Sequence, residues 1–359
     1  MSKYINNNKY FIGIDLHKDS VFWTIKDEAG KIVRQRNFGI NERKKMKEEI
    51  LSLEGEKYAV LEPVCSWMKY RKFLEGQEVE TKVINPLKAK AISYNSLKND
   101  KVDSEMLSEL LRLGFVPEII PKNKEKEEIC QLLNMRSFLV KKRIKLKQKM
   151  REILIRENKR IKRCNVFGKK ARKELLSLKL RSNDRFLIQI IIPIAETLNS
   201  QIKEIDNLLN ERYANYRNIR ILQSIPGVGL LSALVIDSII GEWKRFKKPS
   251  QLSSYAGLVP VSKDSGTKIK RGKITKKGAK QLRAILYQSA LTASKHSYFS
   301  DFYQRIKEKK GHKLALVALS RKLLVLCWYL VNRQTYFNPS YANKPDLVFR
   351  LAPRGRAID

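Results

Sequence analysis

The stretch "FIGIDLHKDS", residues 11–20, joins a short apolar run to a carboxylate. The apolar run predicts a buried β-strand, and Asp15 stands where that strand ends. Asp19 follows four residues later, and we interpret it as a solvated loop residue. A carboxylate at the end of a buried strand needs an explanation in this chain, because the rest of the sequence is strongly basic.

The composition points to a partner rich in phosphate. The chain has 359 residues, enough for two or three domains with cores of their own. Lys and Arg total 74 against 36 Asp and Glu, so the formal net charge is +38. Solubility does not require so large an imbalance, whereas binding to a nucleic acid does favour it.

Other features argue for a cytoplasmic protein without a membrane span. The longest apolar runs, residues 186–194 and 323–331, are too short to cross a bilayer. The N-terminus is polar and shows no secretory signal. The cysteines lie far apart without metal-ligand spacing, so we expect reduced thiols at all four positions: Cys65, Cys130, Cys164 and Cys327.

Residues 1–118 predict an α/β domain. Three strands, a helix, a strand, a helix, a strand and a helix follow one another, with a hairpin turn at residues 27–30. Asn41 is the expected N-cap of the first helix. An opening meander followed by alternating helices and strands indicates a mixed sheet covered by helices.

Residues 119–215 predict a basic, helical coiled-coil region. Roughly half of residues 141–173 are Lys or Arg. Apolar side chains recur every seven residues, which favours a coiled-coil hairpin with its turn near residues 164–168; the repeat is Leu132, Leu139, Leu146 and Ile153. A helical spacer with solvated charges is the alternative, although its charges are usually of mixed sign.

Residues 216–340 predict a mainly helical domain, followed by a polar tail at 341–359. The sequence "ILQSIPGVGLLSALVIDSIIG" opens it and is similar to a helix-hairpin-helix element. Backbone N–H groups near Gly227 and Gly229 would then face a phosphate at a helix N-terminus. A simple turn between two helices explains the same residues.

Four carboxylates are placed where they could converge. Asp15 and Glu62 end two strands, while Asp100 and Asp103 share one face of a helix. Clustered carboxylates repel one another unless a cation lies between them, and hard oxygen ligands suit Mg²⁺. A pair of such ions can support phosphodiester cleavage, so we predict a two-metal site.

These residues resemble a known family. Several segments resemble the N-terminal DEDD domain of transposases of the insertion-sequence 110 family: "FIGIDLHKDS", "LEPVCSWMKY", "VINPLKAKA" and "KNDKVDSEML". Two more resemble its C-terminal transposase domain: "LQSIPGVGLLSALVI" and "SYAGLVPVSKDSGTKIKRGKITKKGAKQLRAIL". The resemblance implies a RuvC-like (ribonuclease H-like) fold in which Asp15, Glu62, Asp100 and Asp103 bind metal.

The resemblance also implies a nucleophile, Ser265, with Ser262 as the nearest competitor. Without the resemblance, the Ser-Gly pair reads as a turn. Basic side chains around it would stabilise a negatively charged transition state: Lys263, Lys268, Lys270 and Arg271. Arg283, on the following helix, is expected either to contact a phosphate or to form a surface salt bridge.

The partners that the resemblance implies are donor DNA, target DNA and a non-coding bridge RNA. A dimer or tetramer is expected, with Ser265 and the acids of one site coming from different subunits. The chain departs from the family pattern at Val64, Cys65 and Asn99, which puts the local loop geometry in question. Two alternatives stay open: a RuvC-like junction nuclease that uses water, and a non-catalytic nucleic-acid-binding protein.

Overall fold

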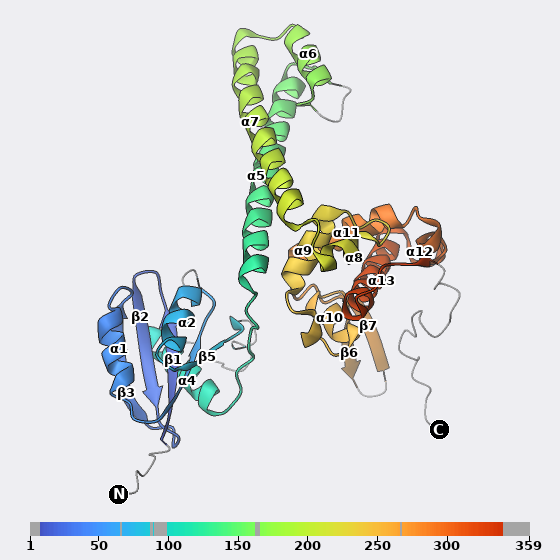
Figure 1. Cartoon of the computed structure of the whole chain (residues 1–359). Coiled ribbons are helices and arrows are strands. Elements are labelled where there is room, and N and C mark those ends of the chain that lie inside the picture. The colour runs from blue at the N-terminus through green and yellow to red at the C-terminus, as the bar shows by residue number, and fades with distance from the viewer. Residues whose placement is uncertain are drawn as a thin grey trace, which may run out of the picture. The chain divides into compact units, whose positions relative to one another are not determined.

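The structure, a computed structural model, describes residues 8–64, 67–86, 89, 99–161, 166–265 and 268–339. The chain divides into two compact units, Met1–Pro121 and Lys122–Asp359. Figure 1 shows the elements of both units. A boundary within the second unit near residue 216 stays a prediction.

The first unit contains a five-stranded mixed sheet in the order β3-β2-β1-β4-β5. The central strand β1 pairs antiparallel with β2 and parallel with β4. This arrangement confirms the predicted α/β class and the order of its elements. The strands are β1 (Lys9–Leu16), β2 (Ser20–Lys26), β3 (Ile32–Gly39), β4 (Glu56–Leu61) and β5 (Glu80–Val83).

Helices cover both faces of this sheet, because successive side chains of a strand point to opposite faces. Ile12, Ile14 and Leu16 belong to a core that also contains residues of α1 (Arg43–Leu51) and α2 (Trp67–Glu75). Leucines of α4 (Asp100–Arg112) form the core on the other face, against which Phe11 packs.

The ends of α1 and α4 differ in how they agree with the predicted helix boundaries. The prediction that Asn41 caps α1 is wrong: the N-cap is Glu42, whose carboxylate instead accepts a hydrogen bond from the Gly39 N–H at 2.9 Å. That bond ties the end of β3 to the start of the helix. Gly114, with φ +71°, follows α4 as predicted, since glycine adopts this backbone conformation without a steric cost.

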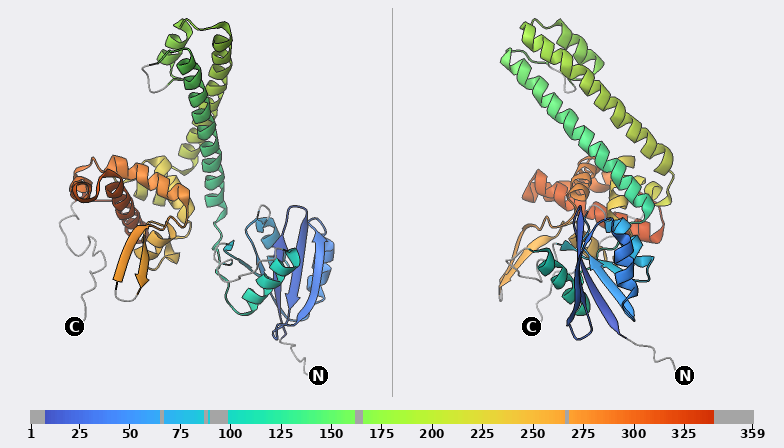
Figure 2. Two further views of the ribbon diagram at one scale, coloured as in Figure 1. Left: turned by 180° about the vertical axis from the view of Figure 1, so that it is seen from behind. Right: turned by 90° about the vertical axis from the view of Figure 1, so that its left-hand side faces the viewer.

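A long helical hairpin begins the second unit. Helices α5 (Lys124–Arg156) and α7 (Ser182–Tyr213) lie side by side in Figure 1 and Figure 2, with α6 (Lys169–Ser177) at the far end. Leu139 and Ile153, from the predicted heptad, are buried. The structure confirms helices here, while their coiled-coil geometry stays a prediction; Cys164 lies outside the described residues.

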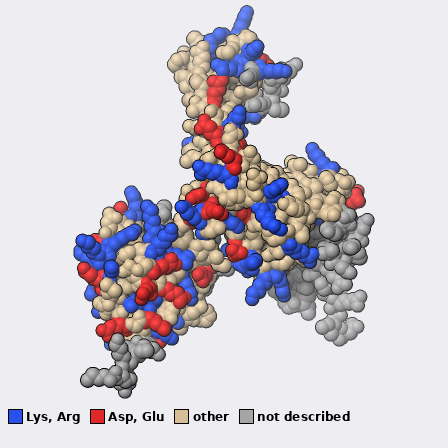
Figure 3. Space-filling model, viewed as in Figure 1, with Lys and Arg blue, Asp and Glu red and all other residues tan. Residues whose placement is uncertain are grey.

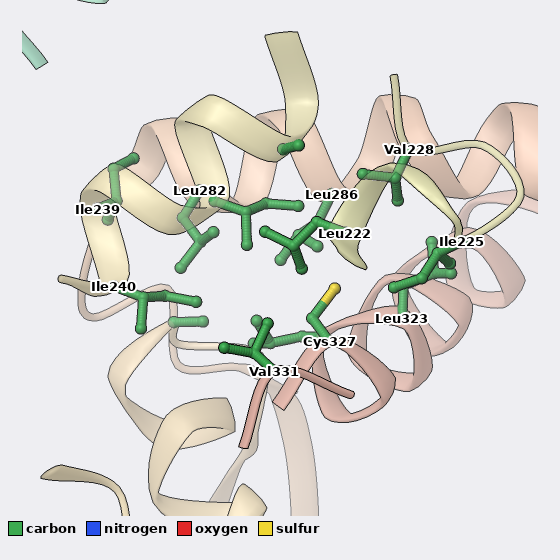
Figure 4. Close-up of a cluster of buried hydrophobic side chains, with 14 of the residues drawn as sticks. Leu222, Ile225, Val228, Ile239, Ile240, Leu282, Leu286, Leu323, Cys327 and Val331 are labelled. Atoms are coloured by element: carbon green, nitrogen blue, oxygen red, sulfur yellow. The ribbon is translucent and has the colours of Figure 1, made fainter. Parts of the chain in front are cut away.

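The remaining helices of the second unit enclose its main core, of which Figure 4 shows a part. Leu323, Cys327 and Val331 from one helix meet residues of several others. The elements are α8 (Arg217–Gln223), α9 (Leu230–Ile240), η1 (Trp243–Arg245), α10 (Pro249–Tyr255), α11 (Lys280–Ala293), α12 (Ser297–Lys310) and α13 (His312–Arg333).

The helix α13 is long and apolar enough to cross a membrane, by length and composition alone. It packs against α11 and α12, and Leu316, Leu319 and Leu323 are fully buried. These contacts are those of a core helix in a folded domain. Among the described cysteines, Cys130 and Cys327 are free thiols, in agreement with the prediction for these two positions.

The second unit contains an element that its sequence does not predict. Strands β6 (Pro260–Ser265) and β7 (Lys268–Ile274) form a separate two-stranded antiparallel sheet. The mainly helical region expected after residue 216 therefore contains a β-hairpin. Its position matters because it carries Ser265.

Candidate active site

Two strand ends bring the first acids to one edge of the sheet. Asp15 is the last residue but one of β1, and Glu62 directly follows β4. The parallel register pairs Ile14 with Leu61. Asp15 and Glu62 are the next residues along these two adjacent strands, so the backbone places them at the same edge, as the sequence predicts for carboxyl ends of parallel strands.

The third and fourth acids arrive on α4, and a glycine permits this helix to lie close to the sheet. A Cβ atom on Gly13 would lie 1.9 Å from the Ser104 carbonyl oxygen and 2.4 Å from the Ser108 nitrogen. Any larger residue would push the helix away. The Thr24 and Ser104 hydroxyls, 2.7 Å apart, form a hydrogen bond that fastens the helix to β2.

Asn99 fixes where α4 begins. It is the N-cap, and its side-chain oxygen accepts a hydrogen bond from the Lys101 N–H at 3.2 Å. An asparagine satisfies an otherwise unpaired helix N–H as threonine does. The departure from the family pattern at this position therefore keeps the helix start, and Asp100 and Asp103 lie in the first turn.

The structure adds His17 to this group of acids. Its Nε2 lies 2.9 Å from Oδ2 of Asp15 and 3.3 Å from Oδ1 of Asp100. His17 begins the turn between β1 and β2, where its N–H donates to the Ser20 carbonyl at 2.9 Å. The sequence shows a histidine two residues after Asp15, but it does not show that the turn brings this ring to the acids. Asp19, in the same turn, is exposed as interpreted.

The electrostatics of the site reflect crowding of like charges. Burial raises the pKa of Asp15, and the charges of Asp100 and Asp103 raise it further, against the lowering effect of His17. Burial lowers the pKa of His17, but the hydrogen bond and charge of Asp15 and the charge of Asp100 outweigh it, so that this pKa is also raised. A cation at this place would relieve the repulsion among the carboxylates.

The donor set fits a divalent metal. Ligand atoms of Asp15, His17 and Asp100 all lie within 4.8 Å of one another. The side chain of Asp15 is 15% exposed, whereas those of His17 and Asp100 are about half exposed, so the group is open to solvent and to a substrate. Glu62 and Asp103 lie outside that three-residue group, although the charge of Asp103 acts on Asp15.

Ser265 is the last residue of β6 and pairs with Lys268 at the turn end of the hairpin. Lys270 and Arg271 lie on β7, opposite Lys263 and Ser262. Side chains of residues 262–271 lie outside the described part of the structure. The backbone therefore gathers serine and basic residues on one hairpin.

The other nucleic-acid-binding candidates have defined contacts. Gly227 has φ +90° and packs against α11, where an added Cβ would lie 2.6 Å from the Ser289 oxygen. Gly229 is the N-cap of α9, with open space beside it. Arg283 donates to the carbonyls of Ala256 and Gly278, at 3.0 and 3.1 Å, and so braces the base of the β6–β7 hairpin.

Basic side chains are spread over the visible surface. Figure 3 shows Lys and Arg on the visible face of both units, with Asp and Glu among them. On α5, Lys141, Lys142 and Lys145 are exposed. Arg143 instead donates to Oδ1 of Asn199 on α7 at 2.8 Å, so it joins the two long helices.

Segments in both units match models of known protein families. Residues 12–157 match the model of a transposase family named for its DEDD domain and the IS110 element. Residues 219–304 match the model described as "Transposase IS116/IS110/IS902 family". The first match contains all four acids, and the second contains Ser265.

Similar proteins support the same assignment over most of the chain. The chain is 28% identical to the transposase for insertion sequence element IS1111A of Coxiella burnetii. The similarity extends over 338 residues and covers 90% of each chain. It is 22% identical to the IS1328 transposase of Yersinia enterocolitica, over 92% of this chain and 99% of that one. It is 26% identical to the pilin gene-inverting protein of Moraxella lacunata, over 76% of this chain and 79% of that one. The chain belongs to the IS116/IS110/IS902 family of transposases, and it is an enzyme that cleaves and rejoins DNA.

Proposed function

We propose that this transposase is a bridge-RNA-guided recombinase that uses metal-bound acids and a serine nucleophile. The observation that carries the proposal is the approach of Asp100 on α4 to Asp15 on β1, in a domain that matches the DEDD transposase model. The similarity to a pilin gene-inverting protein supports strand exchange between DNA sites, as opposed to cleavage alone.

The metal ligands in this proposal are Asp15, Glu62, Asp100 and Asp103, and the metal is Mg²⁺, bound as a pair of ions. A divalent cation held there supplies positive charge to the scissile phosphate. The chain's own contribution is to fix the carboxylates. Gly13 lets α4 approach, Asn99 sets the first turn of that helix, and the strand register aligns Asp15 with Glu62.

Ser265 attacks the phosphorus in the proposed reaction. The serine oxygen forms a bond to phosphorus as the bond from phosphorus to one deoxyribose oxygen breaks. The serine hydroxyl loses a proton and the departing oxygen gains one, so the phosphodiester count does not change. Basic residues of the hairpin, Lys268, Lys270 and Arg271, hold the phosphate and lessen its negative charge.

The proposed partners are donor DNA, target DNA and a bridge RNA, handled by a dimer or tetramer in the cytoplasm. The net charge of +38 supports a phosphate-rich partner. In this proposal Gly227, Gly229 and Arg283 lie near the nucleic acid, and base pairing with the RNA selects the sites.

A denaturing gel tests the chemistry. Purified protein, candidate RNA and end-labelled DNA are mixed, quenched with detergent and treated with or without protease. We expect a protease-sensitive protein–DNA adduct with the wild type and with Ser262→Ala, and none with Ser265→Ala. Asp15→Asn, or excess chelator, should abolish both cleavage and adduct while complex assembly persists, since one hydroxyl or carboxylate adds little to so basic an interface.

A junction nuclease that uses water gives the opposite pattern. Wild-type protein would then cut DNA without an adduct, and Ser265→Ala would cut at a normal rate. A non-catalytic binding protein would cut nothing under any condition. An adduct mapped by mass spectrometry to a residue other than Ser265 would refute the proposed nucleophile and leave the metal site standing.

A further inference from the structure

We propose that His17 is a direct ligand of the metal in the acidic site, so that one ion is bound by nitrogen and oxygen together. This inference rests on the metal site of the proposed function and extends it. The acids alone suit Mg²⁺. An imidazole among them changes which metals the site prefers.

The distances favour binding to one ion. Octahedral ligands at about 2.1 Å from an ion lie about 3 Å from their neighbours. The His17 Nε2 is 2.9 Å from Asp15 Oδ2 and 3.3 Å from Asp100 Oδ1. The His17 nitrogen thus lies at the spacing of adjacent ligands from both carboxylate oxygens, and all three atoms lie within 4.8 Å of one another.

The backbone holds this arrangement from three sides. The turn bond from the His17 N–H to the Ser20 carbonyl fixes the histidine next to β1. Asp15 is part of the strand, and the Asn99 cap fixes Asp100 at the start of α4. A pre-arranged donor set loses less conformational entropy when a metal binds.

The chemistry of nitrogen sets the expected preference. Imidazole suits transition-metal ions such as Zn²⁺ and Ni²⁺ better than Mg²⁺, which prefers carboxylate, carbonyl and water oxygen; among the transition-metal ions Mn²⁺ gains the least from a nitrogen ligand. His17 would therefore raise affinity for transition-metal ions much more than affinity for Mg²⁺. Removing His17 should narrow the difference in affinity between transition-metal ions and Mg²⁺.

Electron spin resonance of Mn²⁺ bound to the full-length protein tests the inference without any DNA. In pulsed spectra we expect ¹⁴N coupling from a directly bound imidazole in the wild type. His17→Gln and His17→Asn should lose that coupling and weaken Mn²⁺ binding about tenfold or more, with a smaller change for Mg²⁺. His296→Asn is the matched control, because asparagine can replace the His296 ring as the N-cap of α12.

The ¹⁴N coupling distinguishes a histidine that binds the metal directly from one that only supports another ligand. Metal affinity alone cannot make this distinction, because losing either kind of histidine weakens binding. Bound Mn²⁺ without ¹⁴N coupling in the wild type would overturn the role of His17 and leave the carboxylate site intact. Coupling that survives in both His17 variants would assign the nitrogen to another residue and also overturn it. Failure of the wild type to bind Mn²⁺ or Mg²⁺ at all would overturn the metal site itself.

Discussion

Single residues decide the geometry of this site as much as the acids do. Gly13 has no side chain, so the backbone of α4 can approach β1 closely. That approach delivers Asp100 to Asp15 and His17. The four acids could be proposed from the sequence because strand ends and helix faces have simple periodicities. His17 could not, because its position depends on how the turn after β1 folds back.

Gly13→Ala is expected to separate α4 from the sheet. The new methyl group would collide with backbone atoms of Ser104 and Ser108, which cannot move as a flexible side chain does. We expect a loss of about 1–3 kcal/mol in the free energy of unfolding of the first unit, together with weaker metal binding. Gly272→Ala is the control, because there the nearest atom, the Val261 oxygen, lies 3.5 Å away. Urea unfolding curves that coincide for wild type and Gly13→Ala would contradict this account.

Glu109 links stability to pH on the same helix. Hydrogen bonds from Arg112 and Lys26, the latter at 3.0 Å, lower the pKa of Glu109 from 4.5 to about 2. The folded pKa lies below the unfolded one, so the stabilisation is complete above pH 4.5 and is lost as pH falls toward 2. Because a third of the side chain is exposed, we expect only about 1 kcal/mol after screening. Glu109→Gln should flatten the fall in stability between pH 5 and pH 3, measured by urea unfolding; parallel curves would refute the assignment.

At the scale of elements, the long helices α5 and α7 present their charges unevenly. Arg136 pairs with Asp206 across the two helices, with a 2.5 Å distance between Nε and Oδ1, and Arg143 bonds to Asn199. Lys141, Lys142 and Lys145 on the same helix are exposed. The structure thus separates cations that join the helices from cations that are available to a phosphate.

Changing the three exposed lysines to glutamine should weaken RNA or DNA binding and flatten its dependence on salt. Each lost phosphate contact should reduce the slope of log affinity against log salt by about 0.7–0.9. Filter binding across a salt series measures this slope, and circular dichroism checks that the helices persist. Arg143→Gln is a useful contrast, because it should cost stability more than affinity. An unchanged slope in the triple variant would mean that this helix surface does not face nucleic acid.

The elements were predictable to the degree that apolar periodicity defined them. In the first unit, strands and helices follow in the predicted order because each buries a regular apolar face. The hairpin β6–β7 could not be predicted, because its sequence, "PVSKDS" and "KIKRGKI", is polar and charged. Its two strands also pair only with each other. The Asn41 cap was wrong because Glu42 bonds back to Gly39 and the helix starts one residue later.

At the scale of the whole molecule, the hydrophobic cores of the two units share no residue in the described part of the chain. The first unit has a core on each face of its sheet, and the larger core lies among the helices of the second unit. Asp237 is the main buried charge of that larger core, at 5% exposure. Its Oδ1 accepts from the Trp243 indole at 2.7 Å and the Asn218 amide at 3.3 Å, and Lys126 lies 3.4 Å from Oδ2.

We therefore expect two thermal unfolding transitions that respond to different substitutions. Asp237→Ala leaves the part-buried Lys126 without its carboxylate and removes an acceptor from two other side chains, so it should destabilise the second unit by about 3–5 kcal/mol. Asp206→Ala, at a side chain that is 41% exposed, should cost about 1 kcal/mol or less. Differential scanning calorimetry should show one transition moved by Asp237→Ala and the other moved by Gly13→Ala, since neither residue contacts the other core. A single transition that both substitutions lower together would show that the two units unfold cooperatively as one.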